Sequence, residues 1–78
     1  MATGDRVTAI VDKHLRLDGK PISPEARLMD DLDANSLDML EMLIAFEEEF
    51  CVTISDAEAA RLATVGDVIE CLKNKPAV

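Results

Sequence analysis

A serine hydroxyl, that of Ser36, lies where a polar segment of the chain meets an apolar, acid-rich one. Asn35 precedes it and is among the best N-cap residues, so Ser36 falls in the first turn of a predicted helix. Asp38 adds negative charge where the helix dipole favours it. A phosphate joined to a hydroxyl at this position would lie beside unpaired backbone N–H groups. Serine at a helix start is more often only a helix starter, so the surrounding residues must decide whether Ser36 is an attachment point.

The acidic residues before Ser36 suggest a second chemistry, the binding of calcium. Residues 31, 33 and 35 place oxygen-bearing side chains at the first, third and fifth positions of an EF-hand loop. The match then fails, because the sixth position needs glycine and is Ser36, and the twelfth needs glutamate and is Met42. We therefore predict no full metal site, and weak divalent binding by this acidic segment stays open as an alternative.

Catalysis by this chain is not expected. General acid–base or nucleophilic catalysis needs a base within reach of the reacting group, and the only histidine is His14, on the apolar stripe of the first predicted helix. The sequence has no Gly-rich phosphate loop and no Cys/His cluster with metal-ligand spacing. We predict that the protein is not an enzyme and has neither catalytic residues nor a metal.

The charge of the chain restricts its partners. Among 78 residues there are eight Lys and Arg against sixteen Asp and Glu, a formal net charge of −8. Such a chain repels nucleic acid and anionic membrane surfaces, so the expected partners are proteins with basic patches. No hydrophobic run is long enough for membrane insertion, and Cys51 and Cys71 have the spacing of neither a disulfide framework nor a metal site. We expect a cytoplasmic monomer in which both cysteines are small packing residues.

The elements that must position Ser36 are helices, because apolar residues recur at helical spacing and no strand pattern competes. Ser55 and Glu58 form a capping-box pattern, and Thr64 is expected to cap the last helix. The turn-forming stretch that contains Pro21 and Pro24 predicts a long connection after the first helix. The first predicted helix begins at residue 3 or 5 and ends near 17, and the second runs from about 36 to 50. A short third helix starts after residue 55, and the last helix starts after residue 64.

The fold class predicted from these elements is all-α, a small three-to-four-helix bundle with a long loop between the first and second helices. Residues 1–78 are expected to form a single domain, with a short flexible tail from about residue 75. A chain this short has a small core, which argues against an elaborate catalytic cleft.

The frame DLDANSLD around Ser36 is followed by LEM at 40–42 and AFEEEF at 45–50. With this frame the chain resembles the acyl carrier proteins of the freestanding, dissociated-synthase type. The resemblance covers nearly the whole chain and includes residues 54–58 and 64–67. In that family an aspartate-serine-leucine motif holds the serine that receives 4′-phosphopantetheine. The resemblance implies that Ser36 carries this arm, which holds acyl groups as thioesters for enzymes of fatty acid, specialised lipid or polyketide synthesis.

The resemblance also implies which residues meet partners and cargo. The expected partners are a phosphopantetheinyl transferase, synthase and acyltransferase enzymes with basic docking patches, and acyl chains. The residues expected to bind partner enzymes are Asn35, Leu37, Asp38, Leu40, Glu41, Ile44, Glu47 and Glu48. Those expected to line an acyl-chain cavity are Leu28, Leu32, Met42, Phe46, Ile54, Ala59, Leu62, Val68 and Leu72.

Two residues depart from the family pattern. Asn35 replaces the usual aspartate before the serine, and Asp33 occupies a position where glycine is common. Asparagine still caps a helix, but one negative charge beside Ser36 is missing, so recognition by a general transferase could be slower. A specialised carrier is one interpretation. The alternatives are an aminoacyl or peptidyl carrier, and a non-modified acidic helical interaction module with weak calcium binding.

Overall fold

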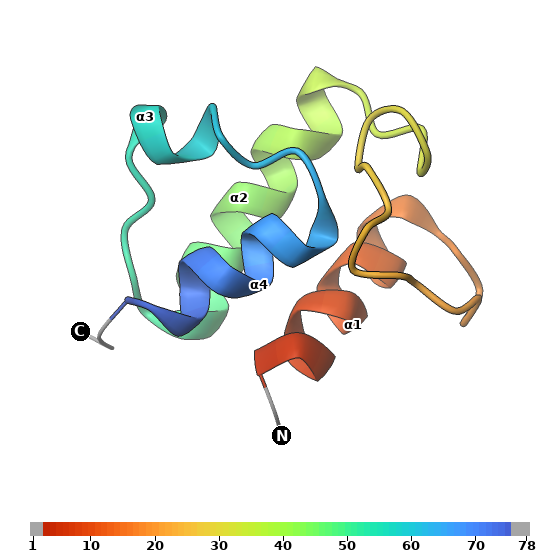
Figure 1. The fold of residues 1–78 in the computed structure, drawn as a ribbon, viewed down its shortest axis with the longest axis horizontal. Helices are drawn as coiled ribbons and strands as arrows, with labels where there is room; N and C mark the ends of the chain where they lie inside the picture. The colour runs from red at the N-terminus through yellow and green to blue at the C-terminus, as the bar shows by residue number, and fades with distance from the viewer. Residues whose placement is uncertain (1–2, 76–78) are drawn as a thin grey trace.

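The computed structural model describes residues 3–75, and four helices form its framework (Figure 1). In chain order they are α1 (Thr3–Leu15), α2 (Ser36–Phe50), α3 (Asp56–Ala59) and α4 (Val65–Lys73). The helix α1 packs against both α2 and α4, and the segment between α1 and α2 is long. The predicted all-α bundle is confirmed. Of the predicted tail, residues 76–78 lie outside the described residues.

The core is built from one face of each of the three longer helices. Residues three or four positions apart share a helix face, so a stripe with this spacing becomes buried when the helices pack together. All of these side chains are aliphatic, apart from one phenylalanine and one methionine. The buried members are Val7 and Val11 of α1, Met42 and Phe46 of α2, and Val65, Val68 and Leu72 of α4.

The first helix ends two residues earlier than predicted, at Leu15 instead of residue 17. Arg16 and Asp18 both have φ of 55°, in the left-handed region, so the backbone leaves the right-handed helix immediately after Leu15. A carboxylate oxygen of Asp12 accepts the Gly19 N–H at 3.2 Å and holds the turn that follows. This turn starts the long loop, residues 16–35.

The long loop is fastened to the start of α4 by its backbone. The Leu28 N–H donates to the Ala63 carbonyl at 2.9 Å, and the Gly66 N–H donates to the Pro24 carbonyl at 2.8 Å. A Cβ atom at position 66 would lie 3.0 Å from that same carbonyl oxygen, so glycine permits the close approach. Because the Leu28 side chain is also buried, the loop is held in place although it has no helix or strand of its own.

The two cysteines differ from their predicted packing role. Cys71 on α4 is half-buried and packs against the core, as expected. Cys51 is exposed and ends α2 in the left-handed conformation, with φ of 53°, so its predicted packing role is wrong. Both are free thiols.

Candidate functional site

A reciprocal pair of hydrogen bonds fixes the start of α2. The Asn35 side-chain oxygen accepts the Asp38 N–H at 2.8 Å, and the Asp38 carboxylate accepts the Asn35 N–H at 3.1 Å. The capping role predicted for Asn35 is confirmed. The return bond from Asp38 was missed, although an acidic residue three positions after the cap is the signal for such a capping box.

Ser36 is the first residue of α2 and is exposed. Asn35 and Asp38 cap the helix, so the Ser36 hydroxyl is not needed for capping. The backbone N–H groups of Ser36 and Leu37 lie in the first turn, where no preceding helical carbonyl is available to accept them. These donors and the positive end of the helix dipole favour an anion at the serine. An exposed hydroxyl in this setting therefore fits a phosphodiester-linked group.

The loop immediately before the serine has an unusual backbone. Asp33 has φ of 60°, in the left-handed region that favours glycine. In the family that this chain resembles, glycine is common at this position, and the left-handed conformation gives a physical reason for it. The next residue, Ala34, is buried, and its N–H donates to the Leu28 carbonyl at 2.9 Å, so the approach to Ser36 is held firmly.

Large apolar side chains are exposed along one face of α2. Leu37, Leu40 and Ile44, at helical spacing, are 62, 55 and 47% exposed. Met29 of the long loop is an apolar residue that was expected to turn inward, and it is instead 52% exposed. Exposed apolar side chains next to charged ones are typical of interaction surfaces. We call Leu37, Leu40 and Ile44 the apolar strip.

The acidic residues assigned to partner binding do not share one environment. Glu41 and Glu48 are exposed, and Asp38 is half-buried in the capping box. Glu47 is half-buried as well, and its carboxylate accepts the Ile54 N–H at 2.8 Å, from the segment that leads to α3. Glu47 therefore already has an internal partner, which no neighbouring residue in the sequence signals.

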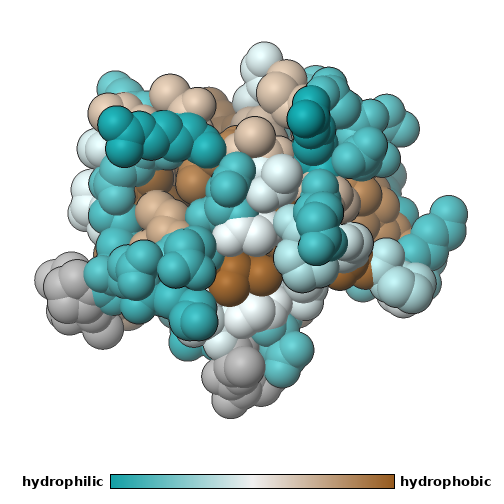
Figure 2. All heavy atoms as spheres, viewed as in Figure 1, coloured by the Kyte–Doolittle hydropathy of each residue, from teal (hydrophilic) through white to brown (hydrophobic). Residues whose placement is uncertain are grey.

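The residues predicted to line an acyl-chain cavity fall into two groups. Six are buried in the core between the helices and the long loop: Leu28, Met42, Phe46, Leu62, Val68 and Leu72. The other three, Leu32, Ile54 and Ala59, are half-buried. Figure 2 shows hydrophobic atoms at the surface in the area that α3, α4 and the segment between α2 and α3 frame in Figure 1. The apolar interior thus reaches the surface beside α3.

A clasp of charged side chains holds α3 beside the end of α4. Glu58 accepts the Ser55 N–H at 3.1 Å, which completes the predicted capping box, and its other oxygen lies 2.7 Å from the Lys75 ammonium nitrogen. The hydrogen bond from Lys75, followed by that from the Ser55 backbone, lowers the pKa of Glu58 to about 2. Burial raises the pKa of the adjacent Cys71 thiol.

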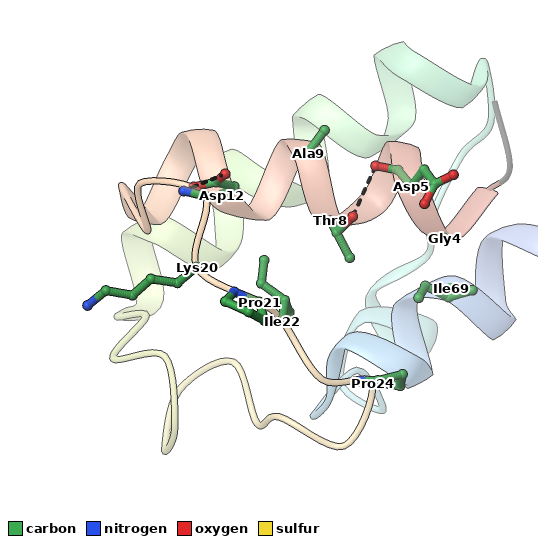
Figure 3. Close-up of a pocket in the computed structure, with 11 residues that line it drawn as sticks. Gly4, Asp5, Thr8, Ala9, Asp12, Lys20, Pro21, Ile22, Pro24 and Ile69 are labelled. Carbon is green, nitrogen blue, oxygen red and sulfur yellow. Dashed lines mark hydrogen bonds between the residues drawn. The ribbon is translucent and has the colours of Figure 1, made fainter.

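The hollow drawn in Figure 3 lies away from Ser36. It is lined by α1, by the long loop around Lys20 and Pro21, and by Ile69 of α4. A different hollow adjoins the start of α2, and His14, Asp38 and Glu41 are among the residues that line it. The single histidine therefore lies near acidic residues of α2, on the side of the molecule where Ser36 begins the helix.

Among residues 3–75, no group of three or more His, Cys, Asp and Glu side chains is arranged to hold a metal ion. The Asp31 carboxylate, the first position of the EF-hand-like segment, accepts the Arg27 N–H at 2.8 Å. No helix in the same range is long and apolar enough to cross a membrane.

Comparison with known proteins places these features in a family. The sequence model of the phosphopantetheine attachment site matches residues 5–72. The acyl carrier protein of Thermosynechococcus vestitus is 47% identical over 73 residues, which cover 94% of this chain and 90% of that protein. A solved structure of a candidate acyl carrier protein from Mycobacterium tuberculosis superposes with a TM-score of 0.88 at 32% identity, covering 92% of this chain and 96% of that one.

The fold and the site together define a small domain that carries a phosphopantetheine group. More particularly, the chain belongs to the acyl carrier protein family. Its cofactor is covalently bound 4′-phosphopantetheine, and its partners are acyl chains and the synthase and acyltransferase enzymes that exchange them. The family resemblance described from residues 31–50 is confirmed.

Proposed function

We propose that Ser36 is the residue that carries 4′-phosphopantetheine. The observation that carries this proposal is that Ser36 is an exposed first residue of α2 whose cap is supplied by its neighbours Asn35 and Asp38. The hydroxyl oxygen would attack the phosphorus of coenzyme A that bears the pantetheine arm, giving up its proton to a base of the transferase. The pyrophosphate bond of coenzyme A would break and adenosine 3′,5′-bisphosphate would leave, and the first-turn N–H groups would stabilise the phosphodiester anion formed on the serine. When bound, the arm supplies a thiol that holds acyl groups as thioesters.

In this proposal the protein positions the arm and offers a surface, and partner enzymes carry out the chemistry. The apolar strip of α2 provides contact area, and the exposed acids Glu41 and Glu48 attract basic groups on the partner. The chain's net charge of −8 would speed the encounter with such a surface. Met29 of the long loop is a further exposed apolar side chain that could contact a partner. We expect the protein to meet these partners in the cytoplasm.

The experiment is an intact-mass measurement on the apo protein incubated with coenzyme A and a broad-specificity phosphopantetheinyl transferase. The wild-type chain is expected to gain one phosphopantetheine, and Ser36→Ala to gain none. Ser23→Ala is the matched control, because it removes another exposed serine hydroxyl while leaving α2 intact. A mass gain that persists in Ser36→Ala would overturn the assignment.

The cargo is the second part of the proposal. We propose acyl groups of fatty acid, specialised lipid or polyketide synthesis, and the half-buried residues beside α3 offer an apolar environment for them. Mass spectrometry of the protein purified from its own cells would report the arm and its cargo together. An amino acid or peptide on the thiol would contradict the acyl assignment and leave the attachment to Ser36 standing.

A further inference from the structure

Three exposed cations lie where α1 ends, in a chain whose net charge is −8. They are Lys13, Arg16 and Lys20, and the one acidic residue between positions 13 and 20 is Asp18. We call the three cations the cationic rim. Within residues 3–75 the salt bridges are made by other cations, and none by a member of the rim. The rim therefore attracts groups that the chain as a whole repels.

The turn that carries the rim has a fixed backbone. Arg16 and Asp18 both have φ of 55°, a conformation that residues other than glycine seldom adopt. The Asp12 carbonyl accepts the Leu17 N–H at 3.2 Å, and the Asp12 carboxylate accepts the Gly19 N–H at 3.2 Å. Such backbone conformations persist where the surrounding structure fixes them, and they cluster at functional sites. A fixed turn presents its cations at a low entropic cost of binding.

The rim borders the surface of α2 that contains the apolar strip. Lys13 and Arg16 line the same hollow as Glu41, and Lys13 and Glu48 line a second hollow between α1 and α2. Glu41 and Glu48 are three and four positions from Ile44, so they adjoin the apolar strip on the side toward α1. A partner that covers the strip therefore meets a row of acidic side chains and, beyond it, a row of cations.

We propose that the cationic rim is a second docking surface for the partner enzymes whose basic groups meet Glu41 and Glu48, the phosphopantetheinyl transferase among them. The rim takes acidic side chains that border the basic patch of the enzyme. This inference rests on the proposed function, because it takes the enzyme to dock on the apolar strip. Two rows of opposite charge fix the orientation of a partner more closely than one acidic surface does. An enzyme with a uniformly basic patch is repelled at the rim, so the rim also selects among partners.

The first test measures steady-state kinetics of modification by the phosphopantetheinyl transferase of the organism that makes this carrier. Lys13→Gln combined with Arg16→Gln is expected to raise the KM for the carrier about fivefold and to leave kcat within about twofold, because binding is lost and chemistry is not. Arg61→Gln combined with Lys73→Gln is the matched control. It removes two exposed cations elsewhere and gives the same net charge, so its KM should stay within about twofold of the wild type.

Three kinetic results would overturn the proposal. They are an unchanged KM in the rim variant, a lower KM in that variant, and an equal rise in the rim variant and the control. If one of them is found while the wild type gains its phosphopantetheine at Ser36, the proposed function stands and the second docking surface does not.

The second test does not depend on attachment at Ser36. A hexaglutamate peptide is titrated into the isotope-labelled apo protein at low salt, and amide chemical shifts are followed by residue with NMR. The shift changes are expected to concentrate in residues 13–20, to fall about threefold in Lys13→Gln combined with Arg16→Gln, and to persist in the control. No change in residues 13–20, or an equal change in the rim variant, would overturn the rim as a site for acidic groups. Peptide binding without modification of the wild type would overturn the proposed function alone.

Discussion

The two ends of α2 differ in how their side chains are used. At the start, the capping box satisfies the backbone locally, and the side chains of Ser36, Leu37 and Leu40 extend into solvent. At the end, Glu47 and Glu49 are both engaged, one with the segment before α3 and one with Arg6 of α1. One helix therefore serves two purposes. Its last turn is fixed to the rest of the molecule, and its first turn is left accessible to other molecules.

The largest expected effect comes from shortening an exposed side chain at the accessible end. Leu40→Ala should lower kcat/KM for modification by a phosphopantetheinyl transferase about tenfold, because it removes apolar contact area at the centre of the strip. Alanine keeps helix propensity, so thermal unfolding should be unchanged. Steady-state kinetics and a melting curve check both statements. A lower melting temperature with unchanged kinetics would instead assign Leu40 to the stability of the fold.

Removing Arg6, which attaches the end of α2 to α1, should lower the stability of the fold and leave the modification rate unchanged. The Arg6 guanidinium lies 4.2 Å from the centroid of the Phe50 ring and donates to the Glu49 carbonyl at 2.7 Å. Arg6→Ala should destabilise the fold by about 1 kcal/mol, since these contacts are partly exposed and screened by solvent. Urea denaturation measures this loss. Arg61→Ala, an exposed arginine between α3 and α4, is the comparison variant, and the modification rate should be unaffected in both.

The fixed end also contains a backbone conformation that a different residue would suit better. Cys51 ends α2 with φ of 53°, a conformation in which glycine is favoured. Cys51→Gly should stabilise the protein by about 0.5–1 kcal/mol, because it removes the steric strain of the left-handed conformation. Denaturation midpoints in reducing buffer give the sign. Cys51→Ala, which keeps the Cβ atom, should show no such gain.

Restoring a charge at the accessible end is expected to act on recognition more than on stability. Asn35→Asp keeps a side-chain oxygen for the Asp38 N–H, so the cap is retained. The added charge should speed modification by a general transferase about threefold. Initial rates at two salt concentrations test this, because the gain should shrink as salt rises. Equal rates for the two proteins at low salt would mean that the transferase does not read this position.

The smallest expected effect concerns pH and the clasp of α3. The pKa of Glu58 falls from an ordinary 4.5 to about 2 in the folded protein, so its stabilising contribution is complete above pH 4.5 and is lost as pH falls toward 2. Glu58→Gln should therefore melt at a lower temperature than the wild type at pH 7, and the two curves should converge near pH 2. Glu48→Gln removes the same charge from an exposed side chain and is the control.

The predicted features that are confirmed rest on signals close together in the sequence. The bounds of α2, the cap at Asn35 and the capping box of Ser55 each depend on residues within one helical turn. The end of α1 was wrong by two residues, because apolar Leu17 continues the periodicity while the backbone turns at Arg16. Side-chain periodicity does not report φ, so the apolar pattern continues past the residue where the backbone leaves the helix.

The missed features join residues that are distant in sequence. Arg6 meets Glu49 across 43 positions, and Glu58 meets Lys75 across 17, and neither pairing has a local signal. For the same reason, the sequence did not separate Glu47 from Glu48, which differ only in what approaches them in space. The proposed attachment residue and its cap are consecutive in the sequence, whereas the surroundings of the candidate site depend on the packed fold.

The manner in which the long loop is fastened has a consequence for how such carriers can diversify. Its ties to the start of α4 run between main-chain atoms, among them the Val65 N–H to the Ala26 carbonyl at 3.0 Å and the Leu28 N–H to the Ala63 carbonyl. Main-chain hydrogen bonds are indifferent to most substitutions, and residues 29 and 30 of the loop are exposed. These two positions are therefore open to sequence drift and to deliberate redesign, by which a carrier could acquire a new partner preference while the bundle keeps its shape.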